Sequence, residues 1–389
     1  MSTLFTGISE LRTVSERGTL NDAAIIAQSG TIAWVGPASE APAADEKVDL
    51  GGRAVLPGWV DSHTHMVFDG DRSAEFEARI SGGSYEAGGI AVTMDATRQA
   101  GTDRLDKLVA DRVAAGRRGG TTTFETKTGY GLNTESEVEA AKVASRHVDD
   151  VTFLGAHLVP PGADAEEYLD EVVGPMLEGV APYVQWIDVF CERGAFNEEQ
   201  SRRVLEAGKK LGLGLRVHGN QLGEGPGVAL AVELGAASVD HVNHLTDEDV
   251  ELLANSDTVA TMLPACDLST REPLAPGRTL LDAGATLAIA SNLNPGTSYT
   301  SSMNYCVTTA VLQQHLSVDE AIHAATTGGA TALRRHNVGN GHDPQGRPAK
   351  GTIVEGAAAD LHVLDAPSAV HLAYRPGMPM SYRTFVAGA

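Results

Sequence analysis

Cysteine is scarce in this sequence. The chain has 389 residues and only three cysteines, Cys191, Cys266 and Cys306, at wide spacings and without a C-x-x-C pair. This pattern argues against a disulfide framework and against a cysteine-rich zinc module, and it is typical of free thiols in a reducing compartment. We therefore expect a cytoplasmic protein.

Long apolar runs and basic residues are also lacking. No stretch of about 18 or more apolar residues occurs, so no transmembrane helix is expected, and the N-terminal residues MSTLFTGISELRTV do not resemble a signal peptide. Lysine and arginine number 29 against 51 aspartates and glutamates, a formal net charge of −22. Such a surface repels nucleic acid and anionic membranes. The acidic surface does not exclude a small anionic substrate, because the local charge of a cleft decides whether such a substrate binds.

The middle of the chain repeats one pattern. Eight short apolar runs, rich in β-branched residues and ending in polar ones, are separated by amphipathic segments that predict helices. The runs cover residues 59–65, 121–130, 151–157, 186–192, 214–220, 238–244, 259–266 and 286–294. This is the pattern of a (β/α)8 TIM barrel, and we prefer it to a doubly wound sheet because no G-x-G-x-x-G turn follows the first run. The longest crossover, residues 66–118, should cover the mouth of the barrel.

Both chain ends consist of short strand-like pieces punctuated by glycine and proline. Since chain termini often lie close together, we expect residues 1–55 and 350–389 to form one small β-sandwich domain. Residues 56–349 then form the barrel, and the fold class is α/β.

Histidines stand where several of the predicted strands end, and in a TIM barrel these ends carry the active site. His63 and His65 are two apart, so on a strand they would point to the same face and could bind one cation. His218 ends the fifth run and is either a third ligand or a satisfied core histidine. His241 ends the sixth run and is either a ligand or an acid–base group.

Three imidazoles with an open position form a catalytic rather than a structural metal site. A metal held in this way lowers the pKa of its bound water from 15.7 to about 7 and polarises the carbonyl that it faces. Nitrogen and oxygen ligands allow one divalent zinc or iron ion, and the sequence does not choose between them.

Several longer sequence segments resemble those of a known family. LPGWVDSHTH, the early β-rich segment and GTIVEGAAADLHVLD are similar to the metal-dependent amidohydrolase superfamily. More narrowly, the chain resembles the imidazolonepropionases of histidine degradation. The matching runs are HTHMVFDGDRSAEFEAR, GGSYEAGGI, ETKTGYGL, TFLGAH, DVFCERGAF, RVHGNQL, DHVNHL and NPGTS, and they occur in the family's order.

The resemblance implies hydrolysis of 4-imidazolone-5-propanoate, a small anionic heterocycle, to N-formimino-L-glutamate. It places metal ligands at His63, His65, His218 and Asn292, and catalytic roles at His241 and Asn292. It also implies a homodimer, for which the sequence itself shows no interface signal. The implied substrate contacts are Arg72, Tyr85, Tyr130, His157, Gln221, Asn294, Gly296 and Thr297.

These residue types suit the implied substrate. The planar guanidinium of Arg72 matches a carboxylate, and the hydroxyls of Tyr85 and Tyr130 can donate to the same group. His157 is either a ring contact or a buried structural histidine. Lys127 would suit a carbamylated metal bridge, but we expect a structural lysine, because the resemblance implies a single metal.

Asn292 departs from the family pattern, which usually has aspartate there. An amide offers a carbonyl oxygen to a metal but cannot act as a base. Gln221 is likewise an amide where relatives are often acidic. We hypothesise a working enzyme in which His241 handles the proton; a weakened site is the competing explanation.

Two other functions are compatible with the sequence. One is a different amidohydrolase, which opens another cyclic amide or deaminates a nitrogen heterocycle; Arg72 and the two tyrosines argue against it, because a neutral base needs no carboxylate clamp. The other is a silent barrel that only binds a ligand, and such a barrel has little reason to keep a metal.

Overall fold

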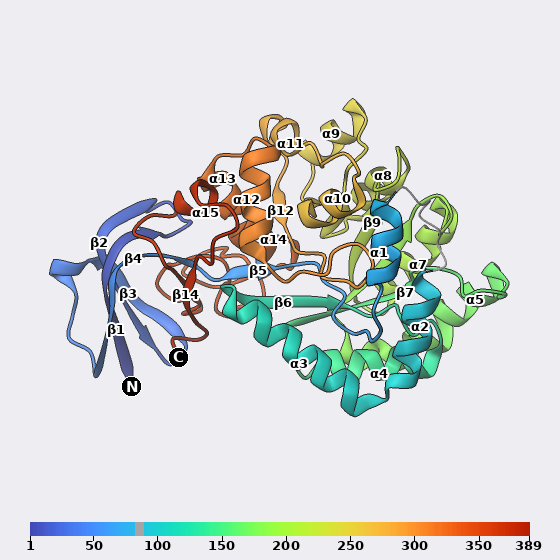
Figure 1. Cartoon of the computed structure of the whole chain (residues 1–389), viewed down its shortest axis with the longest axis horizontal. Helices are drawn as coiled ribbons and strands as arrows, with labels where there is room; N and C mark the ends of the chain where they lie inside the picture. The colour runs from blue at the N-terminus through green and yellow to red at the C-terminus, as the bar shows by residue number, and fades with distance from the viewer. Residues whose placement is uncertain (82–88) are drawn as a thin grey trace.

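The structure, a computed structural model, describes residues 1–81 and 89–389. Eight parallel strands follow one another in chain order around the barrel, as expected, and the helices surround them (Figure 1). All eight expected strands are present, although most end before the polar residues that follow them. They are β5 (Trp59–Asp61), β6 (Thr121–Lys127), β7 (Asp150–Ala156), β8 (Trp186–Cys191), β9 (Gly214–Gly219), β10 (Ser238–His241), β11 (Val259–Met262) and β12 (Leu287–Ile289).

The first and last strands meet just beyond their ends. His65 N–H donates to the Leu293 carbonyl (2.8 Å), and Asn292 N–H donates to the His63 carbonyl (3.0 Å). Below them, the buried Asp61 carboxylate accepts the Ser291 N–H (2.9 Å) and hydroxyl (2.6 Å). This closure brings the H-x-H segment beside Asn292, although the two are far apart in the sequence.

The helices follow the expected alternation. In α7, for example, Asn197 and Gln200 form a capping box, and Val204 and Leu205 face the core. The helices are α1 (Ser73–Ile80), α2 (Gly89–Ala100), α3 (Thr102–Arg118), α4 (Thr134–Ala144), α5 (Ala165–Glu171), α6 (Leu177–Val180), α7 (Glu198–Lys210), α8 (Gly227–Leu234), α9 (Asp247–Ala254), α10 (Pro264–Thr270), α11 (Gly277–Ala283), α12 (Met303–Gln313), α13 (Val318–His323), α14 (Gly329–Ala332) and α15 (His371–Tyr374). The long first crossover contains α1, α2 and α3, and α1 contacts the loop after β12 through Arg79, which donates to the Gly296 carbonyl. Among the described residues, no helix has both the length and the apolar character that a membrane span requires.

Strands from both chain ends build the small β-sandwich domain beside the barrel (Figure 1). Its sheet has the order β14-β13-β4-β1-β2-β3, with β1 and β4 parallel. Phe5, Ile25, Val363 and Phe385 are among the buried residues of its core. The limits of the two domains at residues 55 and 350 remain a prediction. The strands are β1 (Ser2–Arg12), β2 (Thr19–Gln28), β3 (Thr31–Pro37), β4 (Glu46–Pro57), β13 (Leu361–Leu364) and β14 (Ser381–Phe385).

A buried histidine lies where the small domain meets the barrel. His362 on β13 packs edge-on against Trp59 of β5 and shares a 2.8 Å hydrogen bond between its Nε2 and the Ser381 hydroxyl. Burial lowers the pKa of His362 to about 3. The junction therefore requires a neutral imidazole.

This requirement predicts a pH-dependent stability. Between about pH 6.5 and 3 the unfolded chain binds a proton at this histidine and the folded chain does not, so its contribution is lost as the pH falls through that range. In His362→Gln, the free energy of unfolding should therefore depend on pH less steeply, by up to about 1.4 kcal/mol per pH unit. Urea unfolding between pH 4 and 6 measures the slope, with the exposed His315→Gln as control. Equal slopes in His362→Gln and wild type would contradict the prediction.

Candidate active site

Three imidazoles converge at the mouth of the barrel. His63 and His65 lie just after β5 ends at Asp61, and His218 lies on β9. Their ring centroids are 4.6–5.4 Å apart, and one nitrogen of each ring lies within 4.8 Å of the others. The expected H-x-H pair lies in this cluster, although both members stand beyond the regular strand.

Hydrogen bonds from below determine which nitrogens face the centre of this cluster. His63 Nδ1 donates to Asp240 Oδ2 (2.6 Å) and His218 Nδ1 donates to Asp188 Oδ1 (3.1 Å). A neutral imidazole that donates from Nδ1 carries its lone pair on Nε2. Among the described residues, His218 Nε2 is buried without a hydrogen-bond partner.

The spacing of these nitrogens suits a metal ion. His63 Nε2 and His65 Nε2 are 3.2 Å apart, and two nitrogens bound at about 2.0–2.1 Å to one tetrahedral zinc ion would stand about 3.3 Å apart. Burial lowers the pKa of His63 and His65 well below the usual value, which keeps both rings neutral as metal ligands must be. The residues present therefore fit a divalent cation.

A buried charge network supports the imidazoles. Lys127 Nζ lies 2.9 Å from Asp188 Oδ2, 3.0 Å from Glu125 Oε1 and 3.7 Å from Asp240 Oδ2, and Arg216 Nη2 lies 3.2 Å from the same oxygen of Asp240. All five side chains are inaccessible to solvent. Burial alone would raise the pKa of both aspartates. The neighbouring cations and histidines outweigh burial and hold both pKa values well below the usual value, so both aspartates stay ionised. Lys127 thus forms ion pairs with the acidic side chains below the histidines, and its structural role remains a prediction.

Asn292 and His241 complete the site floor. Both have left-handed backbone conformations, with φ of 51° and 87°, at the ends of β12 and β10. The Asn292 side chain hydrogen-bonds the Cys266 thiol, while its Oδ1 is buried and has no partner among the described residues. The His241 ring centroid lies 5.5 Å from that of His218 and 5.8 Å from that of His63. Burial lowers the pKa of His241 well below its usual value.

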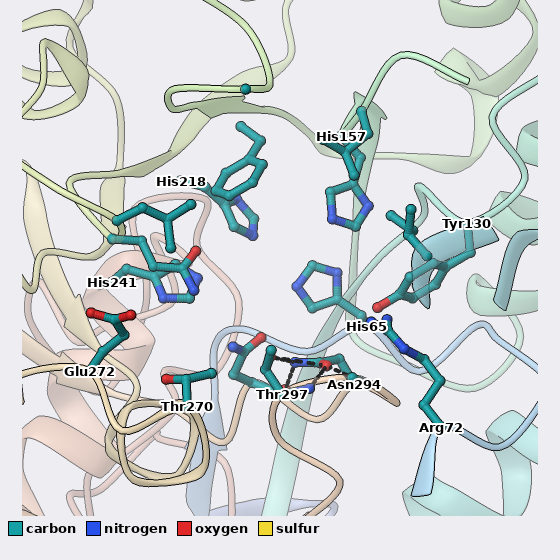
Figure 2. Close-up of a pocket in the computed structure, with 18 of the residues that line it drawn as sticks. His65, Arg72, Tyr130, His157, His218, His241, Thr270, Glu272, Asn294 and Thr297 are labelled. Carbon is teal, nitrogen blue, oxygen red and sulfur yellow. Dashed lines mark hydrogen bonds between the residues drawn. The ribbon is translucent and has the colours of Figure 1, made fainter. Parts of the chain in front are cut away.

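A cavity of about 280 Å³ opens above this floor, and most of the predicted site residues line it (Figure 2). His63 is fully buried and is not among the lining residues, and Tyr85 is outside the described residues. The predicted residues that line it are His65, Arg72, Tyr130, His157, His218, Gln221, His241, Asn292, Asn294, Gly296 and Thr297.

One end of the cavity is built from Arg72, Tyr130 and His157. Figure 2 shows the Tyr130 hydroxyl and the Arg72 guanidinium approaching each other at this end. Arg72 also forms a two-point ion pair with Glu75, with distances of 2.8 and 2.6 Å. His157 Nδ1 donates to the Gly129 carbonyl (2.8 Å), and burial lowers its pKa to about 4, so its Nε2 is an acceptor.

The loop after β12 forms the floor of the cavity beside Arg72. Asn294 uses its amide within this loop: Oδ1 accepts the N–H groups of Gly296 (2.9 Å) and Thr297 (2.8 Å), and Nδ2 donates to the Asn292 carbonyl (2.7 Å). A Cβ at Gly296 would lie 2.5 Å from Arg72 Nη1. Asn294 therefore shapes the loop, and Gly296 leaves the space that Arg72 occupies.

Several cavity residues were not foreseen from the sequence. Arg79 on α1 donates to the Gly296 carbonyl (3.2 Å), and Thr270 and Glu272 follow the seventh barrel strand. In Figure 2 Glu272 lies beside His241, across the cavity from Arg72. The position of Thr270 and Glu272 after a barrel strand was the available signal for them. Phe190 and Arg193 also line the cavity.

Solved structures with a similar architecture include hydrolases and deaminases, and some of them contain zinc. A triazine hydrolase from Arthrobacter aurescens superimposes with a TM-score of 0.76 at 19% identity, covering 100% of this chain and 94% of that one. An adenosine deaminase from Xanthomonas campestris with bound zinc gives 0.70 at 19% identity, covering 99% and 92%. At this identity the likeness shows the fold, and the fold with the histidine cluster defines the class, a TIM-barrel protein with a candidate metal centre at the barrel mouth.

Sequence relatives narrow the class. The chain is 63% identical over 399 residues to an imidazolonepropionase of Arthrobacter sp. (strain FB24), covering 100% of this chain and 99% of that protein. It is 62% identical over 388 residues to an imidazolonepropionase of Saccharopolyspora erythraea, covering 100% and 98%. No family model matches the chain. The chain belongs to the imidazolonepropionase family.

The aspartates below the histidines lead to a prediction about metal binding. Asp188→Asn keeps the side-chain shape but removes the charge that holds His218 and Lys127, so the metal dissociation constant should rise by about 10–100-fold. Competition with a chelator measures it. Asp343→Asn is the matched control, because Asp343 is also buried, 3% exposed, and pairs with Arg347 instead. Wild-type affinity in Asp188→Asn would contradict the prediction.

Proposed function

We propose that this protein hydrolyses the lactam of 4-imidazolone-5-propanoate to N-formimino-L-glutamate, with one divalent zinc or iron ion. One observation carries the proposal: the histidine cluster lies under a cavity whose far end holds Arg72 and Tyr130, in a chain 63% identical to an imidazolonepropionase. A carboxylate clamp at a fixed reach from a metal centre suits a planar ring with a propanoate arm.

The substrate is oriented between the end of the cavity that holds Arg72, Tyr130 and His157 and the histidine cluster. Arg72 and Tyr130 receive the propanoate, because a guanidinium fork and a phenol hydroxyl both donate to a carboxylate. His157 Nε2, an acceptor, receives a ring N–H. The lactam carbonyl then lies over the histidine cluster.

The metal would be held by His63, His65, His218 and the Asn292 carbonyl oxygen. When bound, it lowers the pKa of a coordinated water and polarises the lactam carbonyl. Asp240 and Asp188 keep two of the imidazoles in the tautomer that binds metal.

His241 handles the proton. Its imidazole is neutral because burial lowers its pKa, so it can take a proton from the attacking water as the new C–O bond forms. It then returns this proton to the ring nitrogen as the C–N bond breaks. The Asn292 amide cannot do this, since it is not a base.

Incubation of the metal-loaded protein with imidazolonepropanoate tests the function directly. We expect loss of the ring's ultraviolet absorption and formation of a product with the mass of N-formiminoglutamate. Absence of turnover, together with opening of a different cyclic amide, would replace this substrate by another of the superfamily.

The space at Gly296 tests the carboxylate clamp. In Gly296→Ala the new Cβ would lie 2.5 Å from Arg72 Nη1 and 2.7 Å from its Cζ, so the guanidinium must move. We expect KM to rise by about tenfold or more, with metal content unchanged. Gly225→Ala is the control, because its nearest neighbour would be 4.0 Å away. An unchanged KM in Gly296→Ala would argue against Arg72 as the clamp.

The proton pathway gives a second kinetic prediction. If His241 carries the proton, His241→Asn should lose about 10²–10⁴-fold in kcat, whereas Asn292→Asp should change kcat much less. Steady-state kinetics with matched metal content measure both. A gain of several orders of magnitude in Asn292→Asp would instead identify Asn292 as a disabled position.

A further inference from the structure

A buried glutamate lies behind the loop that carries Tyr130. Glu137, on the first turns of α4, is fully inaccessible to solvent. Its Oε2 accepts the Gly129 N–H (2.8 Å), and its Oε1 accepts the N–H groups of Gly131 (2.7 Å) and Leu132 (2.8 Å). The Thr128 hydroxyl also hydrogen-bonds this carboxylate. Residues 128–132, the Tyr130 loop, are thus wrapped around one carboxylate.

The conformation of the loop depends on this wrapping. Gly129 has a φ of 110°, and a Cβ there would lie 2.6 Å from the Leu154 carbonyl oxygen. A Cβ at Gly131 would lie 2.9 Å from Glu137 Oε1. Leu132 adopts a φ of 51°, a strained value for a leucine that persists only where its surroundings enforce it. The backbone donors to Glu137 supply that enforcement.

The loop connects Glu137 to two cavity residues. Tyr130 lies between the two anchored glycines and is 4% exposed, with its ring centroid 5.5 Å from that of His157. Gly129, whose N–H is bound by Glu137, offers its carbonyl to His157 Nδ1. The same peptide segment therefore sets the place of the Tyr130 phenol and the tautomer of His157.

We propose that Glu137 is a positioning residue for substrate binding: its carboxylate holds the Tyr130 loop so that Tyr130 and His157 Nε2 face the ring and its propanoate. Glu137 itself does not line the cavity, so it acts only through these two residues. The inference rests on the proposed function, because it takes their substrate contacts from it.

Glu137→Gln tests the proposal with the side-chain shape retained. An amide NH₂ replaces one oxygen, so at least one backbone N–H faces another donor. Hydrogen bonds to charged groups are the stronger ones, and we expect KM to rise about tenfold or more, with kcat within about threefold and metal content unchanged. Gly131→Ala, which pushes the loop off the carboxylate, should give the same pattern and serves if Glu137→Gln does not fold.

Glu171→Gln is the matched control. Glu171 Oε1 accepts the Thr134 N–H (3.0 Å) and hydroxyl (2.7 Å) at the start of the same helix. These contacts hold Thr134 rather than residues 128–132, so a loss of helix stability alone should leave KM unchanged. An unchanged KM in Glu137→Gln, or an equal rise in both variants, would overturn the proposal.

A double mutant separates positioning from general weakening. Tyr130→Phe should raise KM in the wild-type background. It should change KM little further in Glu137→Gln, because a displaced phenol hydroxyl no longer contacts the substrate. Additive effects would overturn the proposal. If the wild type does not open the lactam, the proposed function fails, and ¹⁵N-histidine NMR then decides this inference. A shifted His157 Nδ1–H signal in Glu137→Gln, but not in Glu171→Gln, supports it, and an unshifted signal rejects it.

Discussion

The site depends on imidazoles held by carboxylates that are themselves held by two buried cations. Asp240 and Asp188 each accept an Nδ1–H from a histidine of the cluster, and Lys127 contacts both aspartates. With Glu125 and Arg216 the network has one net negative charge, which favours a cation above it. A buried ion network of this kind contributes little to stability by itself, because desolvation is costly. Its role here is geometric, because it orients the neutral imidazoles of His63 and His218 so that their Nε2 lone pairs face the centre of the cluster.

Backbone strain gathers at the same place. Asn220, His241, Val242 and Asn292 lie at or just beyond the ends of β9, β10 and β12, and all have positive φ, between 51° and 87°. Conformations of this kind cost about 1–3 kcal/mol each and are kept where the surroundings over-determine them. Closure of β5 against β12 supplies part of that constraint, because the Asn292 N–H is bound to the His63 carbonyl. The contacts that close the barrel therefore also fix the geometry of the site.

The sequence predicted what depends on local pattern and failed where long-range packing decides. Eight apolar runs gave all eight strands, and histidines at their ends gave the cluster, because a barrel gathers strand ends whatever the loops do. Asp188 stands inside a strand, and Glu137 stands in a helical stretch with a glutamate at every second position from 135 to 139, so neither is marked by its neighbours. Arg79 reaches the cavity only because α1 folds back over the mouth. Such contacts are set by the tertiary fold.

The charge of the cavity resolves an apparent conflict in the composition. A chain with a net charge of −22 should repel an anionic substrate, yet three arginines and one glutamate line the cavity. At physiological ionic strength, interactions between exposed charges fade beyond about 8 Å, so the distant surface acts weakly on a ligand already in the mouth. Inside, Arg72 is 8% exposed, and a carboxylate there meets a poorly screened partner. Glu75 already pairs with this guanidinium, so the substrate carboxylate must either share Arg72 with Glu75 or displace Glu75 from it. This requirement favours ligands whose carboxylate reaches Arg72 while the ring still reaches the histidines.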